Sequence, residues 1–140
     1  MYSVLDVAKY VIFYSNEKKY DISNLKLQKI LYFIQAEFLV SENEPCFYEE
    51  IEAWNFGPVV PEVYHVYKIF GGSNIYIRNF NKDKILQKDR ELIEAMVDEC
   101  AKYSPSRLVE ITHNQAPWKN AYIRGVNNII TKESIKCFFS

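Results

Sequence analysis

One stretch near the middle of the chain, Ile51 to Tyr67, constrains the fold more than any other. It opens with Ile51 to Phe56, a run whose loosely alternating side chains predict a short strand covered on both faces. Gly57 then permits a backbone turn that a side chain would resist. Pro58 and Pro61 stiffen the chain because proline fixes φ, and Pro61 suits the first turn of a helix. We therefore expect a stiff corner between a strand and a helix.

The helix after this corner is expected to stop at the glycine pair Gly71–Gly72. Helical spacing predicts an apolar side made by Val63, Val66, Tyr67 and Phe70. The corner is interpreted first as a scaffold. A second interpretation is a recognition surface made by Trp54, Phe56, Tyr64 and Tyr67.

Two helices are predicted before the corner. Ser3 is the expected cap of the first, in which apolar residues recur at helical spacing as far as Ile12. Ser23 is the expected cap of a longer helix from Asn24 to about Val40, whose apolar face is too wide for a surface helix. This should be the central helix. Gln35 interrupts its apolar second half; a rim position is the favoured interpretation, and a buried hydrogen-bonding group is the alternative.

The second half of the chain is predicted to be mostly helical. Ile75 to Arg78 is β-branched and aromatic, and we expect it to pair with Ile51 to Phe56. The expected later helices are capped by Asp89, by Ser104 before Pro105, and by Thr131, with a further turn starting at Pro117. The predicted fold is mainly α: residues 1–140 form one compact domain of about six helices with a small antiparallel hairpin or sheet.

Composition limits the classes of function. The chain has 49% hydrophobic residues, enough for one core, and a net charge of −1, which gives no overall basic excess for nucleic-acid binding. Three widely spaced cysteines favour reduced thiols in a cytosol, and charged residues within the N-terminal apolar pattern argue against a signal peptide or a membrane span. We expect a cytoplasmic protein. Lysines gather in two groups, which we expect to lie on solvated faces of the protein. The first group is Lys18, Lys19, Lys26 and Lys29; the second is Lys82, Lys84 and Lys88.

Catalytic and metal chemistry are weakly supported by the sequence. His113 is the residue that a catalytic interpretation would choose, with Glu110 or Ser106 as partners by sequence proximity alone. The favoured interpretation is structural: His113 cross-links helices, with Trp118 packed nearby. Trp54 and Trp118 are expected to be buried. No metal ligands stand at paired spacings, so we predict no catalytic, metal or cofactor site; the candidates considered were Cys46, Cys100, Cys137, His65 and His113.

Three segments together carry a resemblance to a known family. They are ISNLKLQKILYFIQAEFL, EEIEAWNFGPVVPEVY and LVEITHNQAPWKNAY. In this order they resemble the Panacea antitoxin domain family, which includes SocA-like proteolytic adaptors and phage-associated GepA-like proteins. The resemblance covers nearly the whole chain. The residues that match its motifs or could bind a partner are Lys26, Gln28, Lys29, Tyr32, Trp54, Phe56, Gly57, Pro58, Tyr64, Tyr67, His113 and Trp118.

The resemblance implies a mainly helical antitoxin that binds and neutralises a toxin encoded beside it. The first alternative, implied by SocA-like members, is an adaptor that delivers the toxin to a ClpX-type protease. The second is a small enzyme centred on His113. A third is binding of DNA or RNA through the lysine clusters, which would be strongly salt-dependent. The oligomeric state is left open by the sequence.

Overall fold

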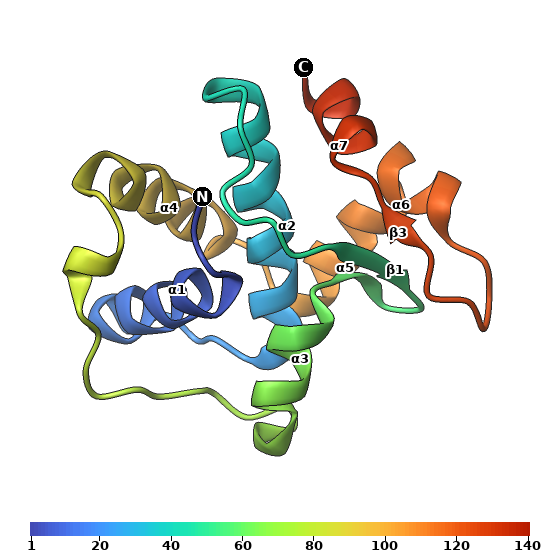
Figure 1. Ribbon diagram of the computed structural model, residues 1–140. Coiled ribbons are helices and arrows are strands. Elements are labelled where there is room, and N and C mark those ends of the chain that lie inside the picture. Colours follow the sequence, from blue (N-terminus) through green and yellow to red (C-terminus); the bar gives the residue numbers. More distant parts are fainter.

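The computed structural model describes residues 1–140 and confirms the mainly α fold with a small antiparallel sheet (Figure 1). It has seven α-helices, one more than expected. The helices are α1 (Val4–Lys18), α2 (Asn24–Ser41), α3 (Pro61–Tyr67), α4 (Gln87–Cys100), α5 (Pro105–His113), α6 (Ala116–Ala121) and α7 (Lys132–Phe139). The strands are β1 (Ile51–Trp54), β2 (Gly57–Val59) and β3 (Ile129–Ile130), and 3-10 turns lie at Lys68–Phe70 and Lys82–Lys84. None of the helices combines the length and the apolar character that crossing a bilayer requires.

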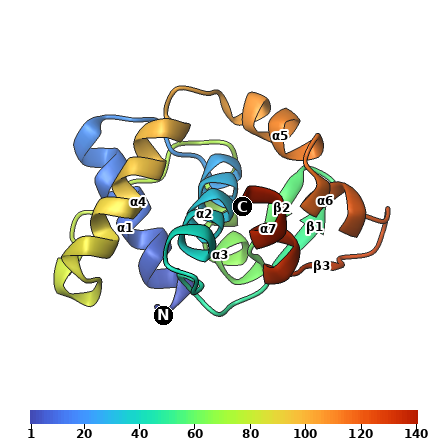
Figure 2. The ribbon, with the colours of Figure 1, turned by 90° about the horizontal axis from the view of Figure 1, so that it is seen from above.

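Helix α2 is the centre of the molecule, as its wide apolar face predicts. Figure 2 shows α2 between the α1–α4 pair and a second group that contains the sheet, α5, α6 and α7. Of its 18 residues, 13 are buried, so it faces protein on nearly every side. It begins at Asn24 because the Ser23 side chain accepts a hydrogen bond from the Lys26 amide at 3.3 Å.

Polar side chains of α2 hold the segment that follows it. The expected rim position of Gln35 is wrong: Gln35 is buried, its Oε1 accepts from the Cys46 amide at 2.8 Å, and its Nε2 donates to the Phe47 carbonyl at 2.8 Å. An unpaired buried amide costs free energy, so this side chain requires the segment to pass alongside it. The returning chain is therefore fixed against α2 before the sheet begins.

The sheet is not the one that the sequence predicts. β1 lies in the middle, with β2 and β3 antiparallel on either side. Ile75 to Arg78 forms no strand; instead the Ile75 amide donates to the Ile22 carbonyl at 2.8 Å. The place expected for it is taken by β3, where Ile130 pairs with Ile51. Two residues are too few to give a periodic signal, so the sequence could not indicate this strand.

The expected cap at Asp89 is also wrong, because α4 begins at Gln87 with Leu86 at the cap position. The Asp89 carboxylate instead accepts a hydrogen bond from the Tyr2 hydroxyl. The same kind of bond recurs between α1 and α4, where Tyr10 donates to Glu94 and Tyr14 donates to Asp98. In both pairs the two residues are 84 positions apart in the sequence. The two tyrosines are four residues apart on α1 and the two acids are four residues apart on α4, so these two faces lie against each other. Several tyrosine hydroxyls therefore donate hydrogen bonds to acidic side chains within the protein.

The corner after β1 leads into α3 with Pro61 in the first turn of the helix, as expected. Ile51 and Ala53 of β1 are buried, whereas its other side chains are only half-buried, so the strand is fully covered on one face alone. Helix α3 is likewise narrower in its apolar contacts than predicted. Val63 and Tyr67 are buried, whereas the other two residues expected on that side, Val66 and Phe70, are 50% and 38% exposed.

Candidate functional site

The β1–β2 hairpin is the point where the three recognised sequence segments meet. Its two-residue turn leads into Gly57, which has a φ of +110°. A Cβ on Gly57 would lie 2.7 Å from Lys29 Cε and 2.9 Å from Thr112 Oγ1. Side chains from α2 and α5 therefore occupy the space that any other residue would need. At this one glycine, the three segments that resemble the family therefore meet: Lys29 comes from the first, Gly57 from the second and Thr112 from the third.

An aromatic stack braces the hairpin turn from the side of α5 and α6. The Trp118 Nε1 group donates to the Trp54 carbonyl at 2.8 Å, and the Tyr122 hydroxyl donates to Asn55 Oδ1 at 3.1 Å. The rings of His113, Trp118 and Tyr122 lie in a row, with centroids 4.1 and 4.5 Å apart. Trp118 is half-buried, so the expectation that it is buried is wrong.

His113 belongs to this brace through its own ring. Its Nε2 lies 3.0 Å from the Asn55 carbonyl oxygen. A carbonyl can only accept, so Nε2 must carry the proton here. Neither candidate partner for a catalytic triad contacts the ring: Glu110 pairs with Arg107, and Ser106 contacts Ser104. The position of His113 is that of a structural cross-link.

The side of the hairpin that faces α2 contains a buried amino group. Lys29 is fully buried, and its Nζ donates to the Pro58 carbonyl at 3.0 Å. The Phe56 ring covers this ammonium, with 5.3 Å between Nζ and the ring centroid. Burial lowers the pKa of Lys29 to about 7, because the charged form loses its hydration. The expectation that this lysine lies on a solvated face is therefore wrong.

Gln28 and Lys26 are also held inside the protein. Gln28 Oε1 accepts from the Val60 amide at 2.9 Å, which satisfies the backbone at the start of α3. Lys26 is buried, and its Nζ donates to the Tyr103 carbonyl at 2.8 Å; desolvation lowers its pKa. The solvated-face prediction fails for this lysine too. Both side chains act on backbone groups of other segments.

Two of the three tyrosines of the motif set, Tyr32 and Tyr67, lie inside the protein, whereas one interpretation placed Tyr67 on a recognition surface. Tyr32 is fully buried, its hydroxyl donates to Gln115 Oε1 at 2.8 Å, and burial raises its pKa. Tyr67 is buried against the core, and desolvation raises its pKa as well. Both residues are placed where they support the fold.

Beside the hairpin turn lies a half-buried group of rings, Trp54 and Phe56 of the hairpin and Tyr64 of α3, which we call the aromatic cluster. The Trp54 ring packs edge-on against Tyr64 at 5.0 Å and against Phe56 at 5.9 Å. The expectation that Trp54 is buried is therefore wrong. Aromatic residues held in one orientation on a rigid element are typical of the anchors of protein interfaces.

Sequence reasoning missed several residues that build this region. Asn55 receives both His113 and Tyr122, and Asn24 joins Gln28 to the Tyr64 carbonyl. The run Asn-Phe-Gly marked a turn, which was the one available signal for Asn55. No local pattern identifies the partners of such a residue, because those partners come from helices about 60 positions away.

These features define a helical domain in which a hairpin, braced by α5 and α6, presents a half-exposed aromatic cluster. The model of the family described as Antitoxin SocA-like, Panacea domain, matches residues 27–119. The chain therefore belongs to the SocA-like antitoxin family that carries the Panacea domain.

One curated relative bears the name Antitoxin SocA and comes from Caulobacter vibrioides (strain NA1000 / CB15N). It is 37% identical over 109 residues, which cover 69% of this chain and 58% of that protein. The chain thus spans less than two thirds of the length of this relative. No solved structure matches the chain.

Proposed function

We propose that this chain is an antitoxin that binds a toxin protein directly and neutralises it in the cytoplasm. The observation that carries the proposal is membership of the SocA-like family, which residues 27–119 establish. The aromatic cluster supports it, because its three rings pack against one another on the hairpin and α3 before any partner arrives. A pre-organised surface loses little conformational freedom on binding.

The mechanism that we propose is masking of the toxin without bond chemistry. His113, the residue that an enzyme would use, has its Nε2 proton engaged by the Asn55 carbonyl. The amino group of Lys29 lies behind the Phe56 ring and donates to Pro58. Both side chains therefore hold the hairpin in place, and the accessible rings beside it are left to make contacts.

The test is co-expression of this chain with the product of the adjacent reading frame, scored for growth and for co-purification. Rescued growth together with a stable complex is the expected result. A toxin level that falls only in cells with a ClpX-type protease would replace masking by delivery to that protease. If the adjacent product is toxic and this chain does not relieve the toxicity, the antitoxin proposal is wrong.

A further inference from the structure

A hollow of about 330 Å³ opens beside the aromatic cluster, between the start of α2 and the end of α3. Its volume is near the lower end of the range for small-molecule sites, so it suits one or two inserted side chains. The residues that line it are Asn24, Leu25, Phe56, Tyr64, Lys68 and Gly71.

The floor of this hollow offers little to a polar ligand. Asn24 is buried, and both ends of its amide are used: Oδ1 accepts from Gln28 Nε2 at 2.9 Å, and Nδ2 donates to the Tyr64 carbonyl at 3.1 Å. The other half-buried lining residues are Leu25, Phe56 and Tyr64, which present mostly apolar surface. An apolar side chain would therefore match the floor without leaving a buried polar group unpaired.

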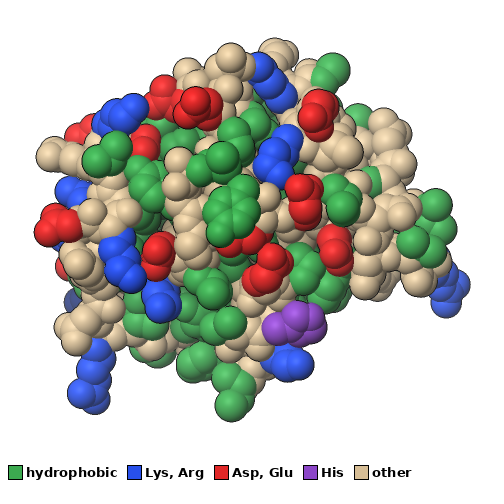
Figure 3. Space-filling view, viewed as in Figure 1, with side chains coloured by type: hydrophobic (Ala, Val, Ile, Leu, Met, Phe, Trp, Pro, Cys, Tyr) green, Lys and Arg blue, Asp and Glu red, His purple; other side chains and the backbone are tan.

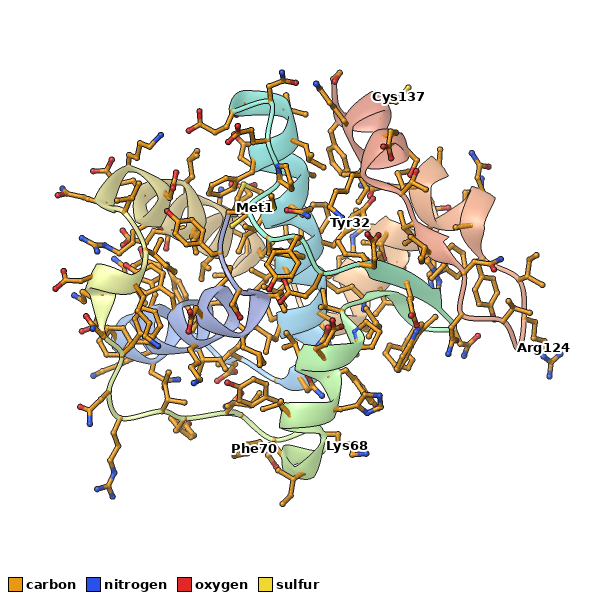
Figure 4. The ribbon with its side chains drawn as sticks, viewed as in Figure 1. Met1, Tyr32, Lys68, Phe70, Arg124 and Cys137 are labelled. Carbon is orange, nitrogen blue, oxygen red and sulfur yellow. The ribbon has the colours of Figure 1, made fainter.

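The rim of the hollow carries one cation, and exposed apolar side chains follow it along the chain. Lys68 is exposed and forms no ion pair in the structure. The adjacent Ile69 is 85% exposed, and Phe70, which precedes Gly71, is 38% exposed. Figure 3 shows hydrophobic side chains at the surface at the lower end of the molecule, and Figure 4 places Lys68 and Phe70 there. Large apolar side chains gathered beside a hollow are typical of interaction sites.

We propose that this hollow receives an apolar side chain of the toxin while a neighbouring carboxylate of the toxin pairs with Lys68. This inference rests on the proposed antitoxin function and assigns it a surface. The apolar floor selects the inserted group, and the unpaired ammonium selects the charge beside it. Ile69, which follows Lys68 in the chain, extends the contact along the partner.

Two substitutions test the surface without disturbing the core, because both residues are exposed. Lys68→Glu reverses the charge at the rim, and Ile69→Glu places a charge in the apolar contact. The matched controls are Arg124→Glu and Ile123→Glu, in the loop between α6 and β3; Figure 4 shows Arg124 far from Lys68. The probe is the purified product of the adjacent reading frame, with its Kd measured by calorimetry.

We expect Lys68→Glu to weaken the Kd by about tenfold and Ile69→Glu by about thirtyfold, as for a rim charge and an interface anchor. The two controls should bind like the wild type. Lys68→Met should weaken binding less than Lys68→Glu and should reduce its dependence on salt.

The outcomes separate this inference from the antitoxin function itself. If the wild type binds the toxin and both test variants bind equally well, the hollow is not the toxin site although the function stands. If the wild type neither binds nor rescues growth, the proposed function and this surface are both wrong. A dimer of the chain alone that Ile69→Glu abolishes would assign the surface to a second copy and overturn the inference.

Discussion

Replacing Lys29 by methionine removes a fully buried amino group while keeping most of the length of the side chain. In the wild type, burial lowers the pKa of this amine from the ordinary value of 10.5 to about 7. Between these two values the unfolded chain binds more protons at this site than the folded chain does. The free energy of unfolding of the wild type must therefore rise with pH across this interval, and methionine removes that dependence.

The magnitude follows from the two pKa values. A full unit of pKa difference is worth about 1.4 kcal/mol, and titration between about pH 7 and pH 9 should add about 2 kcal/mol to wild-type stability. Loss of the hydrogen bond to the Pro58 carbonyl costs the variant about 1 kcal/mol at every pH. Whatever the size of this constant offset, the stability of the variant relative to the wild type should fall by about 2 kcal/mol between pH 7 and pH 9.

The assay is urea unfolding at both pH values, followed by tryptophan fluorescence and far-UV circular dichroism. The control is Lys9→Met, at an exposed lysine of α1, which should leave the pH dependence of the wild type unchanged. Effects of the buried tyrosines cancel, because they are present in all three proteins. A Lys29→Met difference that stays constant between the two pH values would refute the assignment of a neutralised, desolvated amine.

Three further substitutions test the bracing of the hairpin, each by urea unfolding. Gly57→Ala should cost about 2 kcal/mol or more, because φ is +110° and the new Cβ would lie 2.7 Å from Lys29 Cε; a neutral effect would contradict the close approach. Gln28→Leu should cost about 1 to 3 kcal/mol, because the buried Val60 amide loses its acceptor, and an equally stable variant would show that this bond contributes nothing. Trp118→Phe should cost about 1 to 2 kcal/mol through the lost indole donor, and an equally stable variant would show that the ring packing alone matters.

Much of the helical framework could be predicted from the sequence. The caps at Ser23, Ser104 and Thr131 are present, and each side chain accepts a bond from the amide three residues on. The central position of α2 followed from its wide apolar face, and the stiff entry to α3 followed from Pro61. These features depend on interactions within a few residues, which a linear sequence displays directly.

The chemical state of individual side chains could not be predicted in the same way. Lysine and glutamine are usually found at the surface, yet Lys29 and Gln35 are both buried. Each donates a hydrogen bond to a backbone carbonyl of the segment between α2 and α3. Tryptophan is usually buried in the core, yet Trp54 and Trp118 are both only half-buried. Burial depends on which distant segment covers a side chain, and residue type records only an average.

By itself, then, the sequence determined the helix positions, the rigid corner and, through three ordered segments, the family. Only the tertiary structure decided that β3 pairs with β1 and that His113 and Trp118 brace the hairpin turn. It also decided that Gly57 has no room for a side chain between α2 and α5. The physical reason is the distance along the chain over which each kind of interaction acts. Periodicity and capping act within one or two turns of the chain, whereas the hairpin is held by groups about 30 to 60 residues away that meet only after the core has formed.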